Sequence, residues 1–82
     1  MQTRKRPVCA YVLINVKAGK AKPIAQQLAA LDGVRQAHAC WGVPDVIAYA
    51  EVGSQRELDR LVMETIQKLE GVERTDTHIT LD

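Results

Sequence analysis

Few side chains in this 82-residue sequence are of the types that catalyse reactions or bind metals. His38 and Cys40 lie two residues apart, so on a strand they would share one face and could form a nucleophilic pair, or bind a metal together with His78. No C-x-x-C pair or tight His/Cys cluster accompanies them, and neither histidine lies in a recognisable nucleophile motif. Ordinary packing is the better interpretation. We therefore expect no catalytic residue, no metal site and no cofactor.

Nucleotide and nucleic-acid binding receive little support. Ala18-Gly19-Lys20 lacks the rest of the G-x-x-x-x-G-K-[ST] phosphate loop and instead predicts a turn before a helix. The chain has no Phe, and Tyr11 and Tyr49 are isolated, whereas an RNA-binding sheet stacks bases on aromatic side chains of its central strands. No helix-turn-helix precedes the predicted domain, so we expect no direct DNA binding.

The loop Trp41-Gly42-Val43-Pro44-Asp45 is the remaining candidate site. Gly42 permits close approach of a ligand, and free backbone groups there could bind the ammonium and carboxylate groups of a zwitterion. Asp45 could pair with the ammonium group. The alternative is that Gly42, Pro44 and Asp45 merely form a turn and Trp41 merely packs.

The elements before this loop must position it. Val8 to Val16 is a nearly continuous apolar run, which is typical of a central strand. A helix follows, with Pro23 predicted at its first position, an apolar face and Gly33 after its end; that face carries Ile24, Leu28 and Leu31. Val34 to Trp41 is predicted to be extended, with Gln36, His38 and Cys40 on one face.

The elements after the loop repeat this pattern. Val46 to Val52 is predicted to be a strand, so the loop joins a hairpin. Ser54 and Glu57 match a capping box at the start of a second helix, which Gly71 ends. The apolar stripe of this helix consists of Leu58, Leu61, Val62, Ile66 and Leu69. Val72 to Leu81 alternates like a strand, with Thr75, Thr77, Ile79 and Leu81 on one face.

The predicted order is β-α-β-β-α-β. An internal repeat supports it, because Leu31-Asp32-Gly33-Val34 and Leu69-Glu70-Gly71-Val72 both mark a helix end that enters a strand. We predict a ferredoxin-like α+β fold, in which two helices cover one face of a four-stranded antiparallel sheet. The first strand then turns an apolar set of side chains away from the helices. Sheet-against-sheet dimerisation of the dimeric α/β-barrel type, or wider assembly, would bury this set.

The amino-acid composition excludes several classes of protein. Eleven basic and ten acidic residues give a net charge of +1, which excludes a strongly basic nucleic-acid binder. Residues 1–7 are predicted to be a flexible basic tail and residues 8–82 to be one domain. The longest apolar run, Ala10 to Ile14, is too short for a membrane span, and no export signal is recognised. We expect a cytoplasmic protein with no membrane contact and with Cys9 and Cys40 as reduced thiols.

Charge is divided unevenly along the chain. Residues 1–41 carry seven basic groups and one acid, and residues 42–82 carry four basic groups and nine acids. The two halves either neutralise each other within one compact fold or make an oligomer electrostatically self-complementary.

Taken in order, these features resemble the effector-binding domain (RAM domain) of the Lrp/AsnC (leucine-responsive and asparagine regulator) transcription factors, over roughly residues 8–81. The matching features are the strand Tyr11–Val16 with Ala18-Gly19, Leu31-Asp32-Gly33-Val34, the hairpin Gly42-x-x-Asp45, Asp45-Val46-Ile47-Ala48, Leu69-Glu70-Gly71-Val72 and Thr75-x-Thr77. The DNA-binding helix-turn-helix of the family is absent from this sequence, which therefore resembles a stand-alone ligand-binding module.

The resemblance implies dimers joined through the sheet and rings of dimers, such as octamers or decamers, with an amino acid bound between dimers. Carried over, the ligand-binding residues are Trp41, Gly42 and Asp45, together with Thr75 and Thr77. Trp41 departs from the family, whose hairpin often has a small polar residue before the glycine. Full-length Lrp/AsnC regulators are implied as possible partners in mixed oligomers.

Two other functions stay open. Dimeric ferredoxin-like domains also serve as small monooxygenases and isomerases, and here His38, His78 and Trp41 would be the residues of such an active site. The third hypothesis is a purely structural interaction domain with an empty loop. A deep cavity that contains a histidine would favour the enzyme, and a uniformly flat calorimetric response to amino acids would favour the scaffold.

Overall fold

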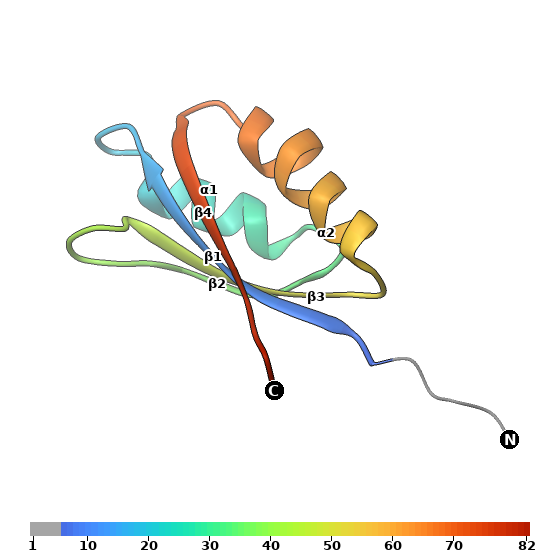
Figure 1. The fold of residues 1–82 in the computed structure, drawn as a ribbon. Helices are drawn as coiled ribbons and strands as arrows, with labels where there is room; N and C mark the ends of the chain where they lie inside the picture. The colour runs from blue at the N-terminus through green and yellow to red at the C-terminus, as the bar shows by residue number, and fades with distance from the viewer. Residues whose placement is uncertain (1–5) are drawn as a thin grey trace, which may run out of the picture.

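The computed structural model describes residues 6–82, and most of the predicted basic tail, residues 1–5, lies outside the described residues. The chain forms β1 (Val8–Val16), α1 (Ala21–Ala29), β2 (Val34–Ala39), β3 (Val46–Val52), α2 (Gln55–Arg60) and β4 (Val72–Ile79), with two short helical turns, η1 (Leu61–Thr65) and η2 (Ile66–Lys68), between α2 and β4. The strands form one sheet in the order β2-β3-β1-β4, and each neighbouring pair is antiparallel. The predicted βαββαβ fold is therefore confirmed (Figure 1).

Both helical segments cover the same face of the sheet, as Figure 1 shows. Every second residue of β1 and β3 points into this layer and is buried, which is the two-residue period expected of strands. The core formed there is entirely apolar. It consists of Ala10, Val12, Ile14, Val16, Ile24, Ala25, Leu28, Val34, Val46, Ala48, Ala50, Val52, Leu58, Leu61, Val62 and Ile66.

The first helix begins earlier than predicted. The structure starts α1 at Ala21 rather than at Pro23, so the proline occupies the third helical position. The first turn of a helix leaves its N–H groups without partners inside the helix, so proline costs no hydrogen bond there either. The proline therefore indicates the first helical turn, but not the position within that turn.

The second helical segment begins as predicted but is not one continuous α-helix. The Oγ of Ser54 accepts a hydrogen bond from the N–H of Glu57 at 3.1 Å, while the Glu57 carboxylate accepts from the N–H of Gly53 at 3.3 Å, one residue before the predicted donor. α2 then widens into the π turn η1 and narrows into the 3-10 turn η2. A four-residue spacing overshoots one α-helical turn, so a wider turn keeps Leu58, Val62 and Ile66 directed at the sheet.

Two strands end earlier than predicted. β2 stops at Ala39 rather than Trp41, and β4 stops at Ile79 rather than Leu81. Trp41 and Leu81 lie beyond the last cross-strand partners and are fully exposed, at 102% and 101%. Alternation of residue types extends past the point where backbone pairing ceases, and for this reason it overestimates the strand length.

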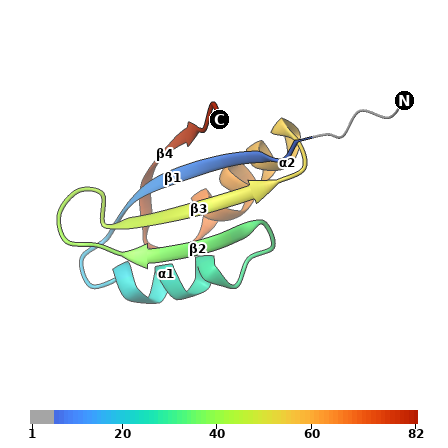
Figure 2. The ribbon, with the colours of Figure 1, turned by 90° about the horizontal axis from the view of Figure 1, so that it is seen from below.

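The face of the sheet away from the helices is the open face, which Figure 2 shows from below. Tyr11 and Leu13 of β1 lie beside Tyr49 and Ile47 of β3, and we call these four residues the apolar centre. The two tyrosine rings are tilted against each other with centroids 4.9 Å apart. The predicted outward-facing apolar set on the first strand is therefore present, and β4 adds a polar margin of Arg74, Asp76 and His78. No helix within residues 6–82 is long and apolar enough to cross a membrane.

Candidate functional site

The β2–β3 hairpin is fixed to the end of β1 by Asp45. The Oδ2 atom of Asp45 accepts a hydrogen bond from the N–H of Val16 at 3.0 Å. Its backbone N–H donates to the carbonyl of Ile14 at 3.1 Å, and its own carbonyl accepts from the N–H of Cys40 at 2.7 Å. Three bonds thus hold this residue at the junction of β1, β2 and β3.

A pocket of about 280 Å³ lies beside this carboxylate, between the end of β1 and the start of α1. We call it the Asp45 pocket. Its lining residues include the acidic Asp45 and the basic Lys17 and Lys22, and the others are Val16, Ala18, Gly19 and Ala21. No side chain caps the start of α1, so first-turn backbone N–H groups add further positive potential. Groups of opposite charge therefore border one small space.

The tip of the hairpin projects away from this pocket. Trp41 is fully exposed and Val43 is 87% exposed. Gly42 has a φ of +96°, which a glycine adopts without strain, and open space lies where a Cβ would be. A large apolar tip in solvent is unusual for a single protomer, so its contacts must be sought in another molecule.

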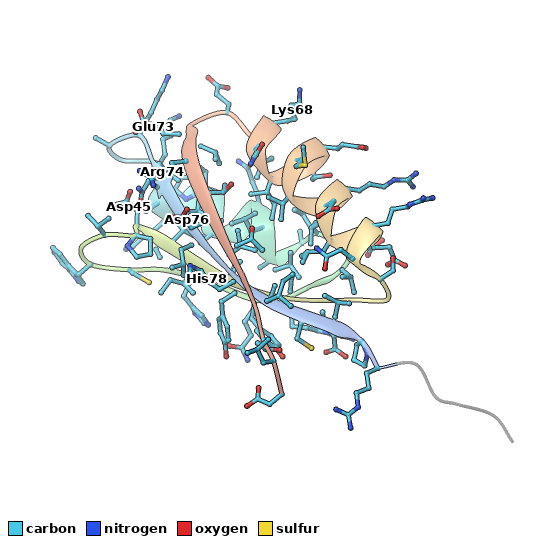
Figure 3. All side chains as sticks on the ribbon, viewed as in Figure 1. Asp45, Lys68, Glu73, Arg74, Asp76 and His78 are labelled. Atoms are coloured by element: carbon cyan, nitrogen blue, oxygen red, sulfur yellow. The ribbon has the colours of Figure 1, made fainter. Side chains whose placement is uncertain are left out.

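Thr75 and Thr77 lie on the helix side of β4. Thr75 is at the same end of the sheet as Asp45, opposite Ile14, but its Oγ1 atom accepts a hydrogen bond from Gln67 at 2.9 Å. Thr77 borders a separate groove between β4 and α2, lined also by Leu58, Val62, Met63 and Ile79. Within one protomer the five residues carried over from the family therefore do not converge on one pocket. Figure 3 shows how Asp45 and the β4 side chains Arg74, Asp76 and His78 are distributed.

Lys17 and Lys22 are the pocket residues that sequence reasoning missed. They flank Ala18-Gly19-Lys20, which was interpreted only as a turn before a helix. Placing the helix start at Pro23 left Lys22 outside the helix, whereas the observed start at Ala21 puts it in the first turn, beside Asp45.

The two histidines lie at opposite edges of the open face. His38 on β2 pairs with Ile47, and its Nε2 atom is 3.3 Å from Oε1 of Gln36. His78 on β4 pairs with Tyr11. Neither lines any of the four pockets found in the described chain, and residues 6–82 contain no cluster of three metal-binding side chains. A histidine-containing cavity, which would favour the enzyme hypothesis, is not among these pockets.

Both cysteines are free and partly buried. The Sγ atom of Cys40 contacts the carbonyl of His38 at 3.6 Å rather than its imidazole. The thiol of Cys9 is hydrogen-bonded to the hydroxyl of Tyr49 on the open face. This bond raises the pKa of Tyr49 to about 12, and the partial removal of the hydroxyl from water contributes to the rise to a smaller extent. Tyr49 therefore stays uncharged at any physiological pH.

A β-sheet covered on one face, with an open apolar face and a charged pocket at the β2–β3 hairpin, describes a class of small ligand-binding and interaction domains. Residues 9–82 match the model of the Lrp/AsnC ligand binding domain family, and the chain belongs to this family.

The relatives support this assignment. An uncharacterised HTH-type transcriptional regulator of Pyrococcus furiosus is 29% identical over 72 residues, which are 88% of this chain and 49% of the relative. A similar regulator of Pyrococcus abyssi is 26% identical over 88% of this chain and 46% of its own length. The chain thus spans about half the length of the curated relatives it matches.

Solved structures agree on the fold. The protein TTHA0845 of Thermus thermophilus superposes with a TM-score of 0.86 at 31% identity, covering 92% of this chain and 94% of the other. AsnC of Escherichia coli superposes with a TM-score of 0.85 at 20% identity, over 100% of this chain and 58% of the other. The regulator NMB0573 of Neisseria meningitidis, solved in complex with L-Met, has a TM-score of 0.80 at 18% identity over 92% of this chain and 50% of the other, and shows the fold alone.

Proposed function

We propose that this chain is an amino-acid-binding oligomerisation module that acts with transcription regulators rather than as an enzyme. The observation that carries the proposal is the Asp45 pocket, a space of about 280 Å³ whose lining residues include Asp45, Lys17 and Lys22. A free amino acid carries an ammonium and a carboxylate group on adjacent atoms, so it matches such a pair of opposite charges. NMB0573, which has a similar fold, was solved in complex with the amino acid L-Met, and this supports the proposal.

The ammonium group of the ligand would contact Oδ1 of Asp45. The ligand carboxylate would contact Lys17 or Lys22 and the free N–H groups at the start of α1. Gly42 at the hairpin tip lies away from the pocket of its own protomer and would approach the bound ligand only from a second copy, where its lack of a side chain permits a close contact. Trp41, Thr75 and Thr77 enter the site only when copies assemble, because within one protomer they lie away from the pocket.

Assembly is proposed to begin with a homodimer through the open face. The apolar centre leaves Tyr11 48% exposed in the protomer, and a second copy laid against it would remove this surface from water. Contacts through the hairpin tips would then join dimers into a ring of eight or ten copies. Mixed assemblies with full-length HTH-type regulators in the cytoplasm are also proposed, because those regulators contain the same domain. Direct DNA binding by this chain is not part of the proposal.

Calorimetry and mass measurement together test the proposal. The purified chain is titrated at about pH 8 with each of the twenty amino acids, and its molar mass is measured by light scattering after gel filtration, with and without the strongest binder. We expect saturable heat for at least one amino acid and a mass that is a multiple of 9.1 kDa. Flat heats for all twenty would refute amino-acid binding, and a 9.1 kDa particle at micromolar concentration would refute assembly.

A further inference from the structure

The open face has a defined chemical layout across its four strands. The strand register places Gln36, Tyr49, Tyr11 and His78 in one row, and His38, Ile47, Leu13 and Asp76 in the next. Each row has two members of the apolar centre in its middle and polar side chains at both ends. The histidines occupy opposite edges, His38 on β2 and His78 on β4, and both are exposed in the protomer.

Both arginines of these strands form ion pairs with a carboxylate. Arg74 and Asp76 neighbour each other on β4, with Nε and Oδ2 3.9 Å apart. At the bulge of β2, Nε of Arg35 lies 3.3 Å from Oε1 of Glu51 on β3. Tyr49 adds no charge, since its pKa is about 12. Because each arginine is offset by a neighbouring carboxylate, the protonation of the histidines decides the net charge of the face.

The chain contains two histidines in total, and both lie on this face. Histidine is the side chain whose ordinary pKa places its change of charge between about pH 5 and pH 8. His78 has Tyr11 across the strand pair, Asp76 two residues before it on β4 and Thr80 two residues after it, just past the strand end. His38 has Ile47 across, Gln36 two residues before it on β2 and Cys40 two residues after it, just past the strand end. Asp76 is already offset by Arg74, so an added proton on either ring leaves uncompensated positive charge.

We propose that the contact between two copies through the open face is a proton-sensitive switch, released when His38 and His78 become protonated. This inference rests on the proposed dimer. Two extra charges on each face would oppose two on the other, and burying an imidazolium also costs desolvation free energy. Both effects oppose the contact when the histidines carry a proton. The dimer is therefore expected to be fully stable where the histidines are neutral and to weaken as the pH falls through the range in which histidine ordinarily gains its proton.

Sedimentation equilibrium of the full chain between about pH 8 and about pH 5.5 tests the switch. We expect the dimer dissociation constant of the native chain to rise about tenfold or more toward acid. The double variant His38→Gln/His78→Gln keeps side chains that hydrogen-bond but do not titrate, and its dissociation constant should change less than about threefold. The single variants should each lose about half of the logarithmic change.

The outcomes separate this inference from the proposed function. A native dimer with the same dissociation constant across the pH range would overturn the switch and leave the dimer in place. The native pH response in the double variant would also overturn it, since other groups would then be responsible. A monomer at about pH 8 would instead refute the dimer itself. Circular dichroism at each pH ensures that loss of fold is not counted as dissociation.

Discussion

At the hairpin, a single carboxylate combines a structural contact with a proposed binding contact. Oδ2 of Asp45 accepts a hydrogen bond from the N–H of Val16 at the end of β1, and the same residue lines the pocket that also contains Lys17 and Lys22. The sequence identified Asp45 as a candidate from the hairpin pattern alone. It could not identify the lysines, because only folding brings the β1–α1 turn beside the hairpin. The shared role of Asp45, Thr75 and Thr77 stays a prediction that requires a second copy.

The substitution Asp45→Asn separates the two contacts of this residue. The amide oxygen of asparagine can still accept from Val16, whereas the negative charge for the ligand ammonium is lost. We expect affinity for the amino acid to fall about tenfold or more, since hydrogen bonds to charged groups contribute roughly 1.5–3 kcal/mol. Calorimetry measures the affinity, and thermal unfolding should show little change. Asp32→Asn, at the other end of the sheet, is the matched control and should bind normally.

The exposed indole at the hairpin tip gives a second prediction at this scale. Trp41→Ser removes a side chain that is fully exposed in the protomer, so the melting temperature of the protomer should stay unchanged. If hairpin tips join dimers, the variant should stop at the dimer in light scattering while the native chain forms larger rings. Equal masses for the two proteins would show that the tip makes no assembly contact.

At the scale of elements, local sequence signals located the helices and strands but not their fine geometry. The capping box placed the start of α2 at the correct residue, because the bond from Ser54 to Glu57 is local in sequence. The π turn at Leu61–Thr65 was not predicted, because packing against the sheet determines it and helix propensity does not. Strand ends were overestimated because the sequence pattern does not reveal where partner strands stop pairing. The bulge between Val34 and Gln36 escaped notice for the same reason.

The cap of α2 can be tested alone. Ser54→Ala removes the acceptor for the N–H of Glu57 and should lower the free energy of unfolding by about 1 kcal/mol. Ser54→Asn restores an N-cap acceptor and should recover most of this loss. Urea unfolding followed by circular dichroism gives both values. A loss of stability with both substitutions alike would mean that the cap bond is not what stabilises this helix start.

At the scale of the whole molecule, the sheet of the protomer has one face covered by helices and one open face (Figure 1 and Figure 2). The helices bury one set of side chains from β1 and β3, and the alternate set, which includes the apolar centre, has no cover. This open apolar set was predicted from the sequence, because the first strand contains no charged residue and one of its two faces must point away from the helices. Which copy or partner covers it, and in what register, is a property of an assembly and is not encoded in any local pattern.

A charge in the apolar centre should separate folding from association. Leu13→Glu would place a carboxylate in a surface that the proposed dimer buries, and burial of such a charge without a partner is costly. The variant should keep its circular dichroism spectrum and elute as a 9.1 kDa protomer. Met63→Glu, at a position 59% exposed on the helix side, is the control and should assemble normally. An intact dimer of Leu13→Glu would place the interface elsewhere.

The strand order β2-β3-β1-β4 has a consequence for paralogues that coexist in one cell. In the proposed dimer the apolar contact comes from the two inner strands, whereas the polar side chains of the open face, among them His38, Asp76 and His78, lie on the two outer strands. Substitutions on the outer strands could therefore change which homologous subunits associate, while the affinity that comes from the apolar contact changes little. A lineage could diversify its repertoire of mixed complexes by altering a few margin residues, without rebuilding the inner strands.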